Sequence, residues 1–281
     1  MSRDLRKQPV EDVLHRVENS LNVRLDQQTL VRKRRSVGAC TNRRTWVRIE
    51  ARPLAKIVAQ GQAGNGLEAA AFLHGIAKPE WLNAVSWLDV PGQAVWRADE
   101  VELVTANPVR FGGSLRGDRD LSEAWWDTLN TSLDNLARQH STRVATPDTE
   151  TITQVLVSAE INRAFPDEID AIITDHKWVV AHADLNWANL TSPECWILDW
   201  EDHGLAPRGL DAATLWISSL TIPALAERVH EERRADLETR SGKLMALFHC
   251  AKIINDSGSA TDPVSELTAR EAAKLIPDLQ R

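Results

Sequence analysis

Carboxylates and amides gather in two neighbouring stretches of the 281-residue chain, HADLNWAN at 182–189 and WILDWED at 196–202. Three of their side chains could act together. A carboxylate such as Asp184 can accept or orient the proton of a hydroxyl, and the oxygens of Asn189 and Asp199 can hold Mg²⁺ against phosphates. Residues of these types therefore suit the transfer of a phosphoryl group to a hydroxyl.

The spacing between the two stretches predicts how the candidate metal ligands meet. The short apolar runs on either side of residue 194 are expected to pair as a tight hairpin. A hairpin centred on residue 194 places Asn189 directly opposite Asp199, and opposed residues have Cβ atoms about 4.5–5.5 Å apart. Asp184 lies one loop earlier, near the same end of the hairpin, so we expect the three side chains to share one site.

The two stretches resemble the aminoglycoside phosphotransferase family, a branch of the protein-kinase-like fold. That family shows an H-x-D-x-x-x-x-N loop and then an apolar strand ending in D-W-E or a similar triplet. The matching residues of this chain are His182, Asp184, Asn189, Asp199, Trp200 and Glu201. The following GLAPRGLD at 204–211 resembles the family's G-x-x-x-x-D-L-A stretch. The resemblance is strong over 178–216 and weaker over most of the remainder.

The resemblance implies a role for each matching residue. Asp184 would orient the substrate hydroxyl as the catalytic base, and Asn189 and Asp199 would bind Mg²⁺. His182 and Asp211 would brace the catalytic loop. ATP and Mg²⁺ are the expected cofactors, although the sequence does not separate ATP from GTP.

Two further carboxylates follow the second stretch directly. Glu201 and Asp202 are either ligands of substrate or metal, or ordinary solvated carboxylates. The sequence leaves both interpretations open.

The first third of the chain offers candidates for nucleotide binding. Residues 38–42 (GACTN) resemble the family's small-residue nucleotide loop, in which backbone N–H groups and Thr41 would hold a phosphate. A plain hairpin turn is the alternative. The fold also calls for a lysine on the third strand that pairs with a helix glutamate. Lys56 and Glu68 are the candidates, and Arg48 competes with Lys56.

The elements that position these residues change character near residue 105. Before it, a short helix is expected at 9–21, strands at 30–37, 44–51, 54–59, 85–88 and 94–104, and an Ala-rich helix at 67–76. After it, Ser122 should cap a helix that runs to about 140, and a second helix should cover 150–164. Helices fill the tail from 209, and two short apolar runs lie at 178–181 and 195–200.

This order predicts an α+β, protein-kinase-like fold of two lobes. Residues 1–105 would form a small, mainly antiparallel β lobe with one helix that binds the nucleotide. Residues 106–281 would form a larger, mostly helical lobe that carries catalysis and binds the substrate.

Charge, hydropathy and cysteine content limit the kinds of partner and the compartment that are expected. Residues 1–100 have an excess of Lys and Arg, which suits a polyanionic nucleotide, and the remainder is acidic, which suits a cationic acceptor. A net charge of −7 makes nucleic acid a poor partner. No apolar run approaches the roughly 18 residues of a membrane span. Three widely spaced cysteines indicate a reducing cytoplasm.

Three hypotheses of function remain. The first is an ATP-dependent kinase for a hydroxyl of a small, amine-bearing molecule such as an aminoglycoside or related antibiotic, with a role in resistance. The second is a metabolic kinase for choline, an amino alcohol or a sugar, which would share every catalytic residue. The third is a non-catalytic nucleotide-binding regulator, which would not need Asp184 as a base. The oligomeric state stays open.

Overall fold

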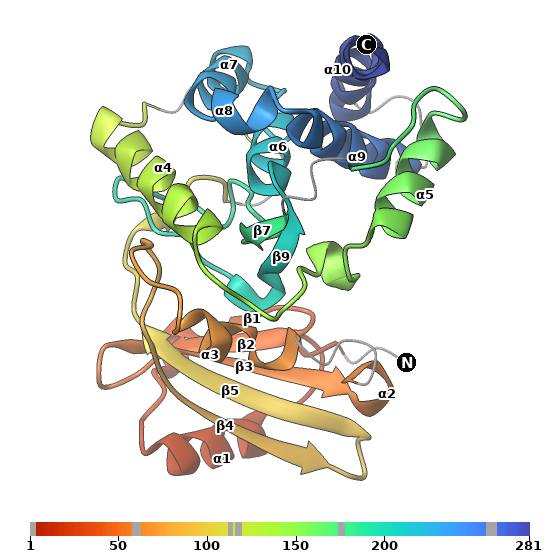
Figure 1. Cartoon of the computed structure of the whole chain (residues 1–281). Coiled ribbons are helices and arrows are strands. Elements are labelled where there is room, and N and C mark those ends of the chain that lie inside the picture. Colours follow the sequence, from red (N-terminus) through yellow and green to blue (C-terminus); the bar gives the residue numbers. More distant parts are fainter. Residues whose placement is uncertain (1–3, 58–62, 112–114, 116–119, 174–177, 257–262) are drawn as a thin grey trace. The chain divides into compact units, whose positions relative to one another are not determined.

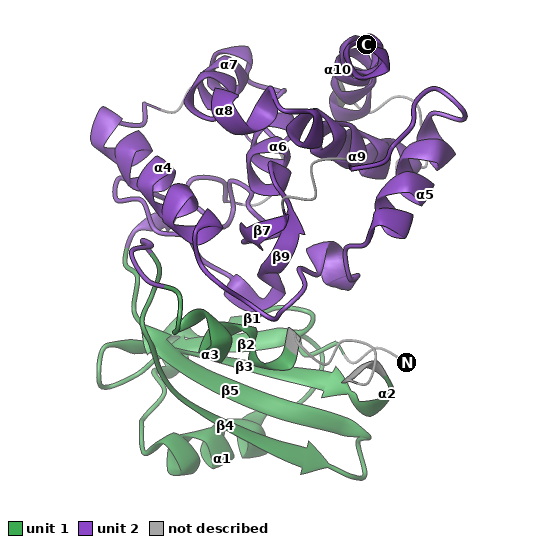
Figure 2. Cartoon of the chain, in the orientation of Figure 1, with its two compact units in different colours: residues 1–73, 78–105 green, residues 74–77, 106–281 purple. Residues whose placement is uncertain are grey.

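The computed structural model describes the whole chain except residues 1–3, 58–62, 112–114, 116–119, 174–177 and 257–262 (Figure 1). Two compact units are present (Figure 2): one holds residues 1–73 and 78–105, and the other holds 74–77 and 106–281. The first is built on an antiparallel sheet and the second is mostly helical. The α+β class expected from the sequence is therefore confirmed.

A five-stranded antiparallel sheet forms the first unit. Its spatial order is β1 (Val31–Arg32), β2 (Ser36–Cys40), β3 (Thr45–Pro53), β5 (Ala94–Glu102) and β4 (Trp81–Asp89). Each strand runs antiparallel to its neighbours. The strand pair expected at 85–88 and 94–104 is confirmed as the β4–β5 hairpin, whose turn is closed by a bond from Gly92 N–H to the Asp89 carboxylate.

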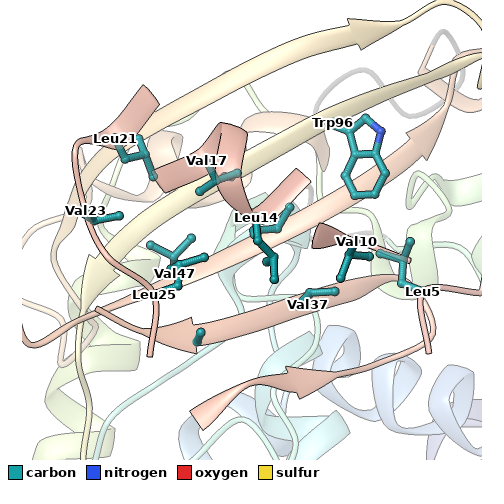
Figure 3. Packing of buried hydrophobic residues seen from close by; sticks show 13 residues of the cluster. Leu5, Val10, Leu14, Val17, Leu21, Val23, Leu25, Val37, Val47 and Trp96 are labelled. Carbon is teal, nitrogen blue, oxygen red and sulfur yellow. The ribbon is translucent and has the colours of Figure 1, made fainter. Parts of the chain in front are cut away.

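Helix α1 (Glu11–Leu21) buries its apolar stripe against one face of this sheet. Its residues Leu14, Val17 and Leu21 point toward strand residues such as Val47 and Trp96 (Figure 3). Along β3, buried and partly exposed positions alternate, as expected for a strand with one face in the core. The expected helix at 9–21 is confirmed, and the opposite face of the sheet is left for polar side chains.

The expected strand at 54–59 is wrong, because residues Leu54–Ile57 form helix α2. A short apolar run does not by itself distinguish a strand from a helix. Pro53 ends β3, since it has no N–H to continue the ladder. Helix α3 spans only Gly66–Ala70, short of the expected residue 76. The chain then turns through Gly75, whose φ of 72° lies in the left-handed region.

Helices dominate the second unit (Figure 1): α4 (Glu123–Ala137), α5 (Gln154–Ala164), α6 (Leu210–Ile217), α7 (Pro223–Glu232), α8 (Arg234–Leu237), α9 (Arg240–Asp256) and α10 (Pro263–Gln280). The central helix is α9, which packs against α5, α6 and α10. The cap predicted for α4 is confirmed, since the Ser122 side chain accepts a bond from Trp125 N–H.

Two pairs of short strands complete this unit and frame the predicted catalytic motif. Strand β6 (Asn107–Pro108) pairs with β8 (Thr191–Ser192), and β7 (Trp178–Ala181) pairs with β9 (Gly204–Pro207). The segment from 182 to 190 therefore starts at one strand pair and ends at the other.

The three cysteines carry free thiols, and two of them are buried. Burial raises the pKa of Cys195 to about 12 and also raises the pKa of Cys250. No helix in the described part of the chain is both long and apolar enough to cross a bilayer.

Candidate active site

The predicted catalytic motif begins where β7 ends, and a carboxylate of α6 holds this point. The backbone N–H groups of His182 and Ala183 donate to the two Asp211 oxygens at 2.7 and 2.9 Å. Ala183 has a φ of 72°, which a non-glycine residue rarely adopts. Burial raises the pKa of Asp211, while His182 and the two N–H donors act in the opposite direction. Asp211 thus fixes a strained turn at the start of the loop.

His182 links the two stretches, 182–189 and 196–202, through both ring nitrogens. It is fully buried, its Nδ1 accepts from Asp184 N–H at 3.3 Å, and its Nε2 lies 2.9 Å from the Leu198 carbonyl. Because Nδ1 accepts from a backbone N–H, Nε2 is the ring nitrogen that donates to the Leu198 carbonyl. The ring also packs edge-on to Trp200 at 4.7 Å. These contacts place His182 as a brace.

Asp184 is held by amide groups on both carboxylate oxygens. Oδ1 accepts from Asn186 Nδ2 and Oδ2 accepts from Asn189 Nδ2, each at 2.9 Å. Both amides also donate to the Asp184 carbonyl. Burial raises the pKa of Asp184 and the nearby Asp199 raises it further, whereas His182 and the two amides lower it. The result is an oriented carboxylate with increased proton affinity.

Asn189 has the donor set expected of a metal ligand. Its two N–H groups are both directed at Asp184, and among the described residues its Oδ1 accepts no hydrogen bond. Mg²⁺ prefers oxygen ligands and usually takes only one or two from the protein when phosphates supply others. Within the described part of the chain, no cluster of three His, Cys, Asp or Glu side chains competes as a metal site. The chemistry of Asn189 therefore suits the predicted site for Mg²⁺ bound together with phosphates, and Asp199 stays the predicted second ligand.

The register of the hairpin between these ligands differs by one residue from the expected one. Leu190 bridges to Ile197, and Leu198 N–H donates to the Asn189 carbonyl at 2.8 Å. Asn189 thus faces Leu198, and Asp199 comes one residue later. The Thr191 hydroxyl closes the turn early, since it donates to Glu194 O and accepts from Trp196 N–H.

A left-handed residue compensates for this shift. A one-residue slip would turn the Asp199 side chain to the opposite side of the hairpin. Asp199 instead leaves the extended conformation, with φ 67° and ψ 59°. Its charge still influences Asp184, as the pKa of that carboxyl shows.

Two residues that had no predicted role, Asn186 and Arg110, also contribute to the site. Asn186 lies inside the motif and holds Asp184, while its Oδ1 accepts from Ala188 N–H at 2.9 Å and from Arg110 Nη2 at 3.1 Å. The position of Asn186, an amide two residues after Asp184, could have predicted the contact between these two side chains. No spacing signals Arg110, which reaches the loop because β6 pairs with β8.

An indole anchors the middle of the loop in the core. Trp187 is buried, its Nε1 donates to the Ser219 hydroxyl at 2.9 Å, and its ring lies 6.1 Å from Trp125 and 6.4 Å from Trp126. Trp187 therefore fills the core, with its N–H satisfied by a hydrogen bond as a buried indole requires.

No protein-family model and no curated protein sequence matches the chain. Solved structures match over nearly its full length. An amicoumacin kinase in complex with AMP-PNP and Ca²⁺ has 10% identity and a TM-score of 0.56, covering 96% of this chain and 94% of its own. An APH(2″) enzyme in complex with GDP and kanamycin has 12% identity and a TM-score of 0.56, covering 96% and 98%. A macrolide 2′-phosphotransferase from Brachybacterium faecium has 14% identity and a TM-score of 0.52, covering 96% and 100%.

The chain has the fold of the aminoglycoside phosphotransferases. The resemblance stated from the motif is thereby confirmed at the level of fold. In the phosphotransferase fold of this chain, every motif residue from His182 to Asp211 lies in the second unit.

The two carboxylates after Asp199 differ in this phosphotransferase fold. Asp202 is buried, and its Oδ1 accepts from the Thr146 hydroxyl at 2.7 Å. That contact joins Asp202 to the loop of Thr146, and a ligand role for Asp202 stays one of the two predictions. Glu201 is only partly buried, and its carbonyl accepts from Arg143. Its carboxylate stays a candidate ligand.

The predicted phosphate loop of the phosphotransferase fold takes another form here. Residues 38–40 belong to β2, and the turn begins at Thr41. A side chain at Gly38 would lie 2.2 Å from the Trp46 ring, so this glycine serves packing. The Thr41 hydroxyl is buried, lies 2.6 Å from the Thr45 hydroxyl and accepts from Arg43 N–H. The group predicted to meet a phosphate is thus engaged within a hairpin turn.

The predicted lysine–glutamate pair can be followed only at its glutamate in the described part of the chain. Glu68 lies on α3 as predicted, but its carboxylate meets Arg97 Nη2 at 3.1 Å. Lys56 lies on α2 rather than on the third strand, and its side chain is outside the described part of the chain. Arg48, the competitor, lies on β3 and forms an ion pair with Glu50. No spacing in the sequence indicates the contact between Arg97 and Glu68, because the two residues lie 29 positions apart.

Proposed function

We propose that this protein is an ATP- and Mg²⁺-dependent phosphotransferase acting on a hydroxyl of a small, amine-bearing molecule. The observation that supports this proposal most directly is the carboxylate of Asp184, which the amides of Asn186 and Asn189 orient through both oxygens. Neighbours in fold are named for amicoumacin, macrolides and a kanamycin complex, which supports an antibiotic-like acceptor and a role in resistance.

Asp184 performs the central task in this mechanism. The acceptor hydroxyl oxygen attacks the terminal phosphorus of ATP, the bond from that phosphorus to the bridging oxygen breaks, and ADP leaves. The hydroxyl proton passes to Asp184. A base held on both oxygens keeps the hydroxyl in line without reorganisation, and its raised pKa favours taking the proton.

The remaining motif residues prepare this step. Asn189 Oδ1 and Asp199 would hold Mg²⁺, which when bound neutralises phosphate charge. Asp211 fixes the backbone before the base, and His182 ties the base to the 198–200 segment. The loop is therefore preorganised by groups that do not themselves touch the acceptor.

Replacement of the base tests the proposal. Asp184→Asn keeps the shape of the side chain but removes the proton acceptor, so turnover should fall by about 10²–10⁴-fold while the melting temperature changes little. Transfer of labelled phosphate from ATP is measured against aminoglycosides, macrolides, choline, amino alcohols and sugars.

Glu194→Gln is the matched control, because it neutralises an exposed carboxylate on the neighbouring turn. Its turnover should equal that of the wild type. Full turnover in Asp184→Asn would exclude the base assignment. A wild type that transfers phosphate to no member of the panel, yet binds ATP, would favour the non-catalytic regulator.

A further inference from the structure

Arg110 is the cation that the fold places on the catalytic loop. Its backbone N–H donates to the Trp187 carbonyl at 2.9 Å, and its Nη2 donates to Asn186 Oδ1 at 3.1 Å. Asn186 in turn donates to Asp184 Oδ1. The guanidinium is therefore separated from the base by a single amide group.

The charge of Arg110 is not neutralised within the described part of the chain. Arg208, Arg228 and Arg233 of the same unit each meet a carboxylate at 2.6–3.0 Å. Arg110 meets none among the residues described, and only one of its five N–H donors has a partner there. Its side chain is partly exposed, so the other donors are available to a ligand.

The surroundings of Arg110 call for an anion. An arginine fork matches phosphate oxygens in geometry, and a fixed cation stabilises the charge that develops during phosphoryl transfer. Arg143, a second guanidinium among the described residues, donates to the carbonyls of Glu201 and His203. Within the described part of the chain, Arg110 is thus the cation that contacts the amide next to the base.

We propose that Arg110 binds the phosphoryl group that is transferred, with Asn186 as the spacer that sets the distance between this cation and the base. The inference rests on the proposed function and adds a residue to it. The Asn186 amide then contacts both the cation and the base: its Oδ1 accepts from Arg110, and its Nδ2 donates to Asp184.

Nucleotide binding without turnover tests this role. Calorimetric titrations with AMP-PNP and with ADP, both with Mg²⁺, are made on the wild type and on Arg110→Gln. Loss of a charge-assisted bond to the terminal phosphate should weaken AMP-PNP binding by about tenfold or more and leave ADP binding unchanged. Arg138→Gln is the matched control, since Arg138 also donates to an asparagine side chain and meets no carboxylate among the described residues.

Each result decides the matter. Equal weakening of both nucleotides, or no change in either, would show that Arg110 only supports the loop and would overturn the inference while leaving the proposed function intact. A wild type that binds neither nucleotide would overturn both. If Arg110→Gln does not fold, Arg110→Lys is titrated; it should reduce the preference for AMP-PNP, because an ammonium lacks the fork, and an unchanged preference would overturn the inference.

Discussion

The carboxylate of Asp184 is held by amides rather than by a counter-ion. Both of its oxygens accept from asparagine side chains, and the ring of His182 lies between a backbone donor and a backbone acceptor. Amides orient a carboxylate without suppressing its basicity as strongly as a paired guanidinium does. The loop thus keeps its base both ordered and able to accept a proton.

A histidine outside the motif makes the stability of the protein depend on pH. Burial and the neighbouring Lys252 lower the pKa of His249 from 6.5 to about 4, while Asp148 acts in the opposite direction. The unfolded chain therefore binds more protons than the folded chain between these values. The free energy of unfolding should fall as pH drops from 6.5 to 4, by at most about 3 kcal/mol, and this contribution is fully present above 6.5.

Denaturant unfolding at pH 7 and pH 4.5 measures this effect. His249→Gln should lose less stability between the two values than the wild type, because its side chain does not titrate. His140→Gln, which changes an exposed histidine, should behave like the wild type. An equal loss in His249→Gln and the wild type would contradict the assignment.

The sequence predicted the residue types of the motif better than their contacts. Asp184, Asn189 and Asp199 were recognisable because their chemistry and spacing suit one reaction, although the placement of Asn189 against Asp199 was wrong by one residue. The cause was a side chain that closes the turn early, which spacing alone does not reveal. Arg110 and Arg97 act through contacts distant in sequence and left no local pattern.

Among the elements, α6 and α9 approach so closely that only glycine fits at their contact. A side chain on Gly242 of α9 would also meet the end of α8, at 2.0 Å from the Asp236 carbonyl. Gly209 has a φ of 95°, and a side chain there would lie 2.6 Å from the Gly242 backbone. Asp211 lies in the first turn of α6. The contact between α6 and α9 therefore also fixes the position of the carboxylate that accepts from the backbone of the 182–189 loop.

Gly242→Ala should therefore destabilise the protein by about 1–3 kcal/mol, because the added methyl group forces two backbones apart. Gly64→Ala is the control, since nothing lies within 4 Å of the position its methyl group would occupy. That variant should differ from the wild type by less than about 0.5 kcal/mol. Urea unfolding compares the three proteins, and a Gly242→Ala protein as stable as the control would refute the packing argument.

Elements with two independent signals were predicted well. The α4 helix had a capping serine and a periodic pattern, and the β4–β5 hairpin had alternation and a turn. Residues 54–59 had only a short apolar run, and the part that is described became a helix. Several agreeing sequence patterns predict the type of an element. Where only one short pattern is present, tertiary contacts determine whether the segment forms a strand or a helix.

For the molecule as a whole, the fold persists although identity to similar solved structures is only 10–14%. Element order and the alternation of buried positions specify such an architecture, and most individual side chains do not. The predicted α+β class was therefore within reach of the sequence, while the acceptor was not, because its recognition depends on side chains that vary between proteins of one fold.

Ligand linkage provides the test at this scale. ATP at about 100 times its dissociation constant should stabilise the protein by about 2.7 kcal/mol when Mg²⁺ is present. Asp199→Ala should abolish the part of the thermal shift that depends on Mg²⁺, since it removes a predicted ligand. Glu194→Ala, which removes an exposed carboxylate from the neighbouring turn, should keep the full shift. A shift in Asp199→Ala equal to that of the wild type would exclude Asp199 from the metal site.

The indole of Trp187 gives the catalytic loop a spectroscopic signature. Neighbouring indoles whose transitions couple produce circular dichroism bands in the near ultraviolet, and the coupling depends on their mutual angle. Trp187 lies near Trp125, with ring planes 21° apart, and near Trp126, with planes 84° apart. The difference spectrum between the wild type and Trp187→Phe would isolate this signal among the eleven tryptophans. Loop order could then be followed during turnover without any attached label.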